Sequence, residues 1–98
     1  MNPKILVSIV TEAAIEKAVI EAVLDLGADS YTTTDVRGRG PRRNDHWEPK
    51  EYRAVRIDVL CDDDVGRAVA AKLADQYFRG YSMTITLSEV HLLRSHPS

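Results

Sequence analysis

The segment KILVSIVTEAAIEKAVIEAVLDLG, residues 4–27, has the pattern of a strand followed directly by a helix. Residues 4–10 are rich in β-branched side chains, which predicts a largely buried strand. From there to about Leu26, apolar residues recur at helical spacing, which predicts an amphipathic helix. We expect Thr11 to cap this helix, because a threonine hydroxyl can accept a hydrogen bond from a free N–H group. Gly27 is predicted to end it, since glycine tolerates left-handed dihedrals.

Three further strands and a second helix complete the predicted order. Strands are expected at Tyr31–Val36 and at about Tyr52–Cys61, where apolar residues alternate cleanly. The aspartates at 62–64 open a helix that runs to about Tyr77, and a last strand begins at Met83. Its alternation slips later, which predicts a bulge near Ser88–Glu89. The β-α-β-β-α-β order predicts an α+β, ferredoxin-like fold, a four-stranded antiparallel sheet with two helices on one face.

The composition indicates one small intracellular domain. The chain has 98 residues, a net charge of −2 and a single cysteine, so an internal disulfide is impossible and a reducing compartment is expected. No apolar run suits a membrane span and no signal peptide is recognisable, so we expect a cytoplasmic protein. The acidic balance argues against binding to nucleic acid. The second sheet face, with Leu6, Ser8 and Val10, is mixed in character, which suits burial against another subunit.

The stretch VRGRGPRRN, residues 36–44, concentrates positive charge where the chain leaves the second strand. Glycines let the backbone approach a ligand, and arginine can bond phosphate or carboxylate with two parallel hydrogen bonds. This predicts a grip on a phosphorylated ligand by Gly38, Arg39, Gly40, Arg42 and Arg43. A solvated basic loop, balanced by the acidic residues Asp45, Glu48 and Glu51, explains the spacing equally well. The loop continues to Lys50, which is long for a compact domain.

No other motif in the chain predicts catalysis or metal binding. The three histidines lie far apart, without metal-ligand spacing. The aspartates at 62–64 are explained by capping and by the helix dipole. Cys61 continues an apolar alternation and is expected in the core. Trp47 with Pro49 suits either a partner contact or a solvated aromatic. We find no nucleophile with a neighbouring base, so the chain is not expected to be an enzyme.

The stretch LGADSYTTTDVRGRG, residues 26–40, resembles the PII family of trimeric signalling proteins. In that family a similar segment leads from the first helix through the second strand into the flexible T-loop. The resemblance extends over the whole chain as one PII-like domain, residues 1–98, with the T-loop at about 38–51. GRGPRR and YFRGYSMTITLSEVHLL are similar to segments of the PII-like proteins of inorganic-carbon metabolism, which accompany carboxysome genes or bicarbonate transporters.

The second half departs from the nitrogen-regulatory branch. The glycine- and lysine-rich loop that helps those proteins hold ATP phosphates is missing between the second helix and the last strand. Pro41 and Arg42 stand where they carry a glutamine that binds 2-oxoglutarate with magnesium. No tyrosine occurs at 38–50 for uridylylation. The chain stops without the cysteine hairpin of the cyanobacterial transporter branch, so the expectation is the carboxysome-type branch.

The resemblance implies a set of ligand residues and partners. It implies an adenine nucleotide, ADP or AMP with ATP and cyclic AMP as further candidates, bound between subunits of a homotrimer. It also implies bicarbonate beside Arg42 and Arg43, with no metal and no prosthetic group. A membrane transporter or a carboxysome protein is the implied partner of the T-loop. The implied nucleotide residues are Thr32, Gly38, Arg39, Gly40, Arg42, Arg43, Leu60, Gly80, Tyr81 and Ser82.

Three other functions are weighed against this one. An RNA-binding ferredoxin-like module would need basic charge and aromatic residues on the central strands. A small hydrolase would need a group that activates water, and none is apparent. A trimeric metal-tolerance protein of similar fold would need more histidine and cysteine than this chain contains.

Overall fold

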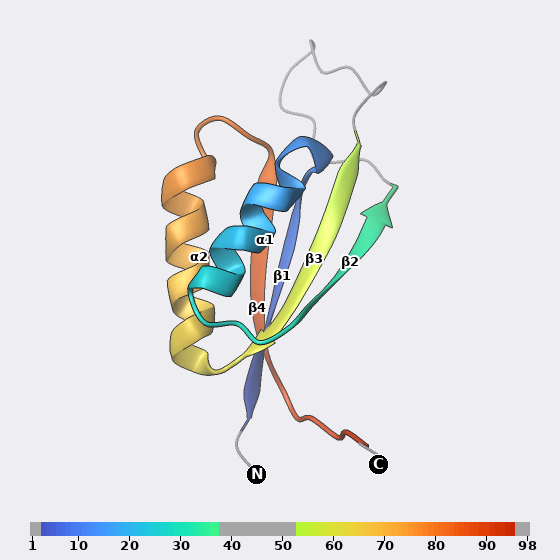
Figure 1. The fold of residues 1–98 in the computed structure, drawn as a ribbon, viewed down its shortest axis with the longest axis vertical. Coiled ribbons are helices and arrows are strands. Elements are labelled where there is room, and N and C mark those ends of the chain that lie inside the picture. The colour runs from blue at the N-terminus through green and yellow to red at the C-terminus, as the bar shows by residue number, and fades with distance from the viewer. Residues whose placement is uncertain (1–2, 38–52, 96–98) are drawn as a thin grey trace.

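The computed structural model describes residues 3–37 and 53–95, and these form a four-stranded sheet with helices on one side (Figure 1). The elements in chain order are β1 (Lys4–Glu12), a short 3-10 helix (Ala13–Ile15), α1 (Glu16–Asp25), β2 (Tyr31–Val36), β3 (Ala54–Cys61), α2 (Asp63–Tyr77) and β4 (Met83–Val90). The strands are ordered β2-β3-β1-β4, and every neighbouring pair is antiparallel. The predicted ferredoxin-like α+β fold is confirmed.

The core lies between the sheet and the two helices. Alternate residues of β1 and β3 point into it, while α1 and α2 contribute one stripe each. Each buried aliphatic side chain of this kind contributes on the order of 1.5–3 kcal/mol. The helix α2 packs close to β1 at Gly66, which has no side chain. A Cβ added there would lie 3.0 Å from Ile5 Cγ2. The fully buried apolar side chains are Val7, Ile9, Val19, Val23, Ile57, Val59, Val69 and Leu73.

The predicted helix cap at Thr11 is wrong. β1 runs two residues further than expected, so Thr11 is part of the strand and continues the buried alternation. Its side chain is fully buried, and its hydroxyl donates to the carbonyl oxygen of Ser82 at 2.8 Å. The 3-10 helix that follows has Glu12 as its first flanking residue and no side-chain cap. The alternation that marks the strand therefore prevails over the capping preference of threonine.

The predicted bulge in the last strand is also wrong. β4 pairs with β1 in one unbroken register from Thr11 opposite Met83 to Lys4 opposite Val90. Val90 therefore lies on the sheet face away from the helices, as Leu6 does. The apolar pattern slips because that open face is itself partly apolar, and not because an extra residue interrupts the ladder. The third strand is described from Ala54, and the predicted start at Tyr52 lies outside the described residues.

The end of α1 is confirmed in detail. Gly27 has a φ of 110°, its N–H donates to the carbonyl of Leu24, and the N–H of Ala28 donates to the carbonyl of Val23. These two bonds form a Schellman motif, which satisfies carbonyl groups that the helix leaves free. The turn after α2 differs, because Gly80 has no positive φ and a Cβ there would meet nothing within 4 Å.

Gly27→Ala should lower the free energy of unfolding by about 1–2 kcal/mol, because a Cβ at this φ clashes with the backbone. Gly80→Ala is the matched control and should raise that free energy slightly or leave it unchanged, since its backbone suits any residue. Urea denaturation followed by circular dichroism measures both. Equal stability of the two variants would contradict the role of Gly27.

Candidate functional site at the end of the sheet

The candidate site lies at the end of the sheet where β1 and β2 finish and β3 and β4 begin. Register places Glu12 and Val36 on either side of Ala54, and Thr11 opposite Met83. The turn that links α2 to β4 lies at this same end (Figure 1), and Val36, where β2 ends, pairs there with Ala54, where β3 begins. Four segments that are distant in sequence therefore meet here.

Three consecutive residues where β1 ends hold this part of the sheet together. The Thr11 hydroxyl donates to the Ser82 carbonyl at 2.8 Å, and a Glu12 carboxylate oxygen accepts the Ser82 N–H at 2.7 Å. The Ala13 N–H donates to the Arg53 carbonyl at 2.8 Å. The junction thus fixes both the α2–β4 turn and the residue where the chain returns from 38–52. Local sequence does not predict these bonds, because Thr11 and Glu12 were expected at the start of the first helix, although the alternation Ile5, Val7, Ile9, Thr11 indicates a longer strand.

The α2–β4 turn presents aromatic side chains to solvent. Tyr77 and Tyr81 meet edge to face, with ring centroids 5.7 Å apart and an interplanar angle of 70°. Phe78 is 50% exposed and Tyr81 is 42% exposed. The predicted ligand residues Gly80, Tyr81 and Ser82 all lie in this turn, so the structure brings them to the sheet end. The predicted ligand residues of the arginine-rich loop lie outside the described residues; these are Gly38, Arg39, Gly40, Arg42 and Arg43. Trp47 and Pro49 lie outside them as well.

The remaining predicted residues lie elsewhere on the same chain. Thr32, the second residue of β2, pairs with Asp58 of β3, and Leu60 pairs with Leu6 further along. Both side chains belong to the open sheet face, opposite the helices. Leu60 is six residues from Ala54 along β3, which is about 20 Å of extended strand. Within one chain, Leu60 therefore cannot share a small ligand with Ser82.

The open face carries a connected polar group at its centre. The Ser8 hydroxyl donates to Asp58 Oδ1 at 2.7 Å, and Arg56 Nε lies 3.3 Å from Asp58 Oδ2. The same face carries the apolar residues Leu6, Val10, Leu60 and Val90, all half-buried. The expected mixed character of this face is confirmed for Leu6, Ser8 and Val10. Because Asp58 already has two partners, this face can be covered without isolating a charge.

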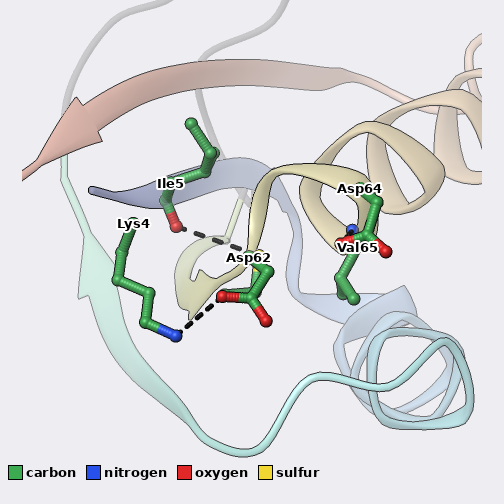
Figure 2. Close-up of polar contacts among 6 residues, drawn as sticks. Lys4, Ile5, Asp62, Asp64 and Val65 are labelled. Atoms are coloured by element: carbon green, nitrogen blue, oxygen red, sulfur yellow. Dashed lines mark hydrogen bonds and ion pairs between the residues drawn. The ribbon is translucent and has the colours of Figure 1, made fainter. Parts of the chain in front are cut away.

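The opposite end of the sheet holds the free cysteine. Lys4 Nζ donates to Asp62 Oδ1 at 2.7 Å (Figure 2). Nearby, the N–H of Val65 donates to the Asp64 carboxylate at 2.9 Å. The ion pair with Asp62 raises the pKa of Lys4. Asp62 flanks α2 without capping it, contrary to the expectation. Cys61 is buried as predicted, its thiol donates to the Ile5 carbonyl, and burial raises its pKa above the ordinary 9.0. A raised pKa suits a packing role.

Residues 3–37 and 53–95 contain no group of three or more His, Cys, Asp or Glu side chains arranged to hold a metal ion. In the same part of the chain, no helix has the length and apolar character needed to cross a membrane.

The fold defines a ferredoxin-like domain, with the α2–β4 turn and its candidate ligand residues Gly80, Tyr81 and Ser82 at one end of the sheet. Comparison with known proteins gives its family. The sequence model of the family described as Nitrogen regulatory protein P-II matches residues 4–97. A PII-like signalling protein of Thermus thermophilus is 33% identical, with 90% of this chain and 87% of that chain covered and a TM-score of 0.75. The chain therefore belongs to the P-II family.

More distant structures share the fold. CPII of Thiomonas intermedia, bound to ADP, AMP and bicarbonate, has a TM-score of 0.79 at 16% identity, with 97% of this chain and 98% of that chain covered. The GlnK–ATP complex of Bacillus subtilis has a TM-score of 0.62 at 21% identity, with coverages of 90% and 82%. No curated protein matches the chain by sequence. The resemblance to PII proteins found in the sequence is thus confirmed.

Proposed function

We propose that this protein is a non-catalytic PII-like sensor that binds an adenine nucleotide between subunits, together with bicarbonate. Its T-loop, residues about 38–51, signals the bound state to a transporter or carboxysome protein in cytoplasmic carbon uptake or fixation. Membership of the P-II family carries the proposal. The ligands of the CPII structure, ADP, AMP and bicarbonate, support the choice of small molecules. The RNA-binding and metal-tolerance alternatives gain no support from the family match.

The residues of the proposed site come from two regions of the fold. The loop base binds the phosphates through Gly38, Gly40 and the arginines Arg39, Arg42 and Arg43. The α2–β4 turn, with Gly80, Tyr81 and Ser82, lines the nucleotide, and Thr32 and Leu60 contribute from the open sheet face. Since Leu60 lies about 20 Å along β3 from the sheet end, a second subunit has to complete the site. The split of these residues within one chain therefore favours an intersubunit position.

A homotrimer follows from this proposal. The open face offers half-buried apolar residues around a satisfied polar centre, which suits contact with other copies. Static light scattering after size exclusion, at micromolar concentration, should give three times the chain mass of 11.0 kDa. A monomer under these conditions would contradict both the assembly and the shared site.

Arg42→Ala should weaken ADP binding by about 1.5–3 kcal/mol, because it removes a charge-assisted hydrogen bond to phosphate. Titration calorimetry measures the change. Arg67→Ala is the matched control, since Arg67 is an exposed arginine near the start of α2 whose recorded ion pair is with Asp63. Equal affinity of the two variants for ADP would remove Arg42 from the site.

Bicarbonate and the nucleotide should strengthen each other's binding. One phosphate group leaves positive charge of the loop base unpaired, and a small anion can neutralise it beside backbone N–H groups. ADP is titrated at constant pH and ionic strength while chloride is replaced by bicarbonate, and a coupling of about 1–3 kcal/mol is expected. Nitrate, a planar anion of equal charge, controls for a general anion effect. An equal effect of nitrate, or none of bicarbonate, would refute carbon sensing and leave nucleotide binding standing.

A further inference from the structure

The open face of the sheet carries few charges, and these balance. Alternation and register assign two basic and two acidic side chains of the four strands to it: Lys4, Arg56, Glu12 and Asp58. Lys4 bonds Asp62 near the start of β1, and Glu12 bonds the N–H of Ser82 where β1 ends. Arg56 and Asp58 lie between them on β3. The other side chains of this face are apolar or carry hydroxyls: Leu6, Ser8, Val10, Thr32, Thr34, Val36, Ala54, Leu60, Thr84, Thr86, Ser88 and Val90.

The helix side of the molecule has a different charge. Together α1 and α2 contain six acidic and three basic residues, so two copies that met through their helices would bring like charges together. Two open faces have no net charge and can meet without this repulsion. The charges therefore favour a second copy of this chain as the occupant of the open face.

Asp58 is the group on this face that covering affects most. Its carboxylate accepts from the Ser8 hydroxyl at 2.7 Å and lies 3.3 Å from Arg56 Nε. The Asp58 side chain is 22% exposed, whereas Asp63, which forms the comparable pair with Arg67 on α2, is 60% exposed. Asp58 has therefore already lost most of its contact with water in the single chain, and a covering copy removes more.

The ion pair with Arg56 decides what this loss of water costs. The apolar residues of the face attract a second copy through a hydrophobic effect that has no preferred direction. An unpaired carboxylate opposes that attraction, because a charge without a partner is costly to cover. A carboxylate that keeps its guanidinium and hydroxyl partners is covered at much lower cost, whereas removal of one partner from a covered pair is strongly destabilising.

We propose that the Arg56–Asp58 pair determines whether copies of this chain assemble through the open face. The apolar residues supply the attraction, and Arg56 permits Asp58 to be covered. This inference rests on the homotrimer of the proposed function and adds to it the residues that control assembly. It requires no bound nucleotide.

The test follows dissociation of the homotrimer on dilution, by analytical ultracentrifugation. Arg56→Leu should raise the concentration at which half of the trimers dissociate by about tenfold or more, because Asp58 loses its counter-charge. The double variant Arg56→Leu/Asp58→Asn also removes the negative charge and keeps an acceptor for the Ser8 hydroxyl. It should assemble nearly as tightly as the wild-type protein. Arg56→Lys retains the positive charge and should also retain the trimer.

Arg67→Leu is the matched control. It breaks an arginine–aspartate pair on α2 whose side chains are 74% and 60% exposed, so assembly should not change. Circular dichroism checks that each variant is folded. Arg56→Gln, which is also uncharged, carries the same expectation as Arg56→Leu should the leucine variant fail to fold.

The possible results separate the two proposals. An Arg56→Leu trimer as stable as the wild type, or a double variant that dissociates as readily as Arg56→Leu, overturns the role of the pair. A wild-type monomer overturns the homotrimer as well and leaves the open face to another partner. A wild-type trimer that binds no adenine nucleotide refutes the proposed function, while restored assembly in the double variant still supports the role of the pair.

Discussion

The pairing of β1 with both β3 and β4 is the constraint on which the rest of the structure depends. β1 is a central strand, and its two registers run without a bulge over the full length described. Because side chains alternate along a strand, one register fixes which face every residue of β1 occupies. The register that buries Val7 and Ile9 under the helices therefore also places Leu6, Ser8 and Val10 on the open face.

The junction at the end of β1 follows from this register. Thr11 lies on the buried side and Glu12 on the open side, so the two side chains reach the Ser82 peptide from opposite directions. The adjoining N–H of Ala13 holds Arg53. The end of β1 thereby holds both the α2–β4 turn, through Ser82, and Arg53, the residue just before β3. Precise positioning of backbone groups is useful in a binding site, because it lowers the entropy lost when a ligand is bound.

The two sheet faces solve different physical problems. The helix side is filled mainly with aliphatic residues, and its buried Thr11 hydroxyl is bonded to the Ser82 carbonyl. The open face mixes half-buried apolar residues with the Ser8–Asp58–Arg56 group, whose members bond one another. Covering a charge is costly when it is unpaired. A face whose central carboxylate already has a hydroxyl and a guanidinium as partners can be covered by a second copy at lower cost.

The sequence by itself determined the fold class, the order of the elements, the buried stripes and the Gly27 helix end, because these depend on local periodicity and on backbone sterics. It also indicated the P-II family from the segment around β2. Only the tertiary structure decided the roles of Thr11, Glu12 and Val90, since each depends on a partner about seventy or more residues away that no local pattern specifies. It likewise separated Leu60 from Ser82. Strand register, a long-range property, sets all of these, and short-range preference is overruled wherever the two disagree.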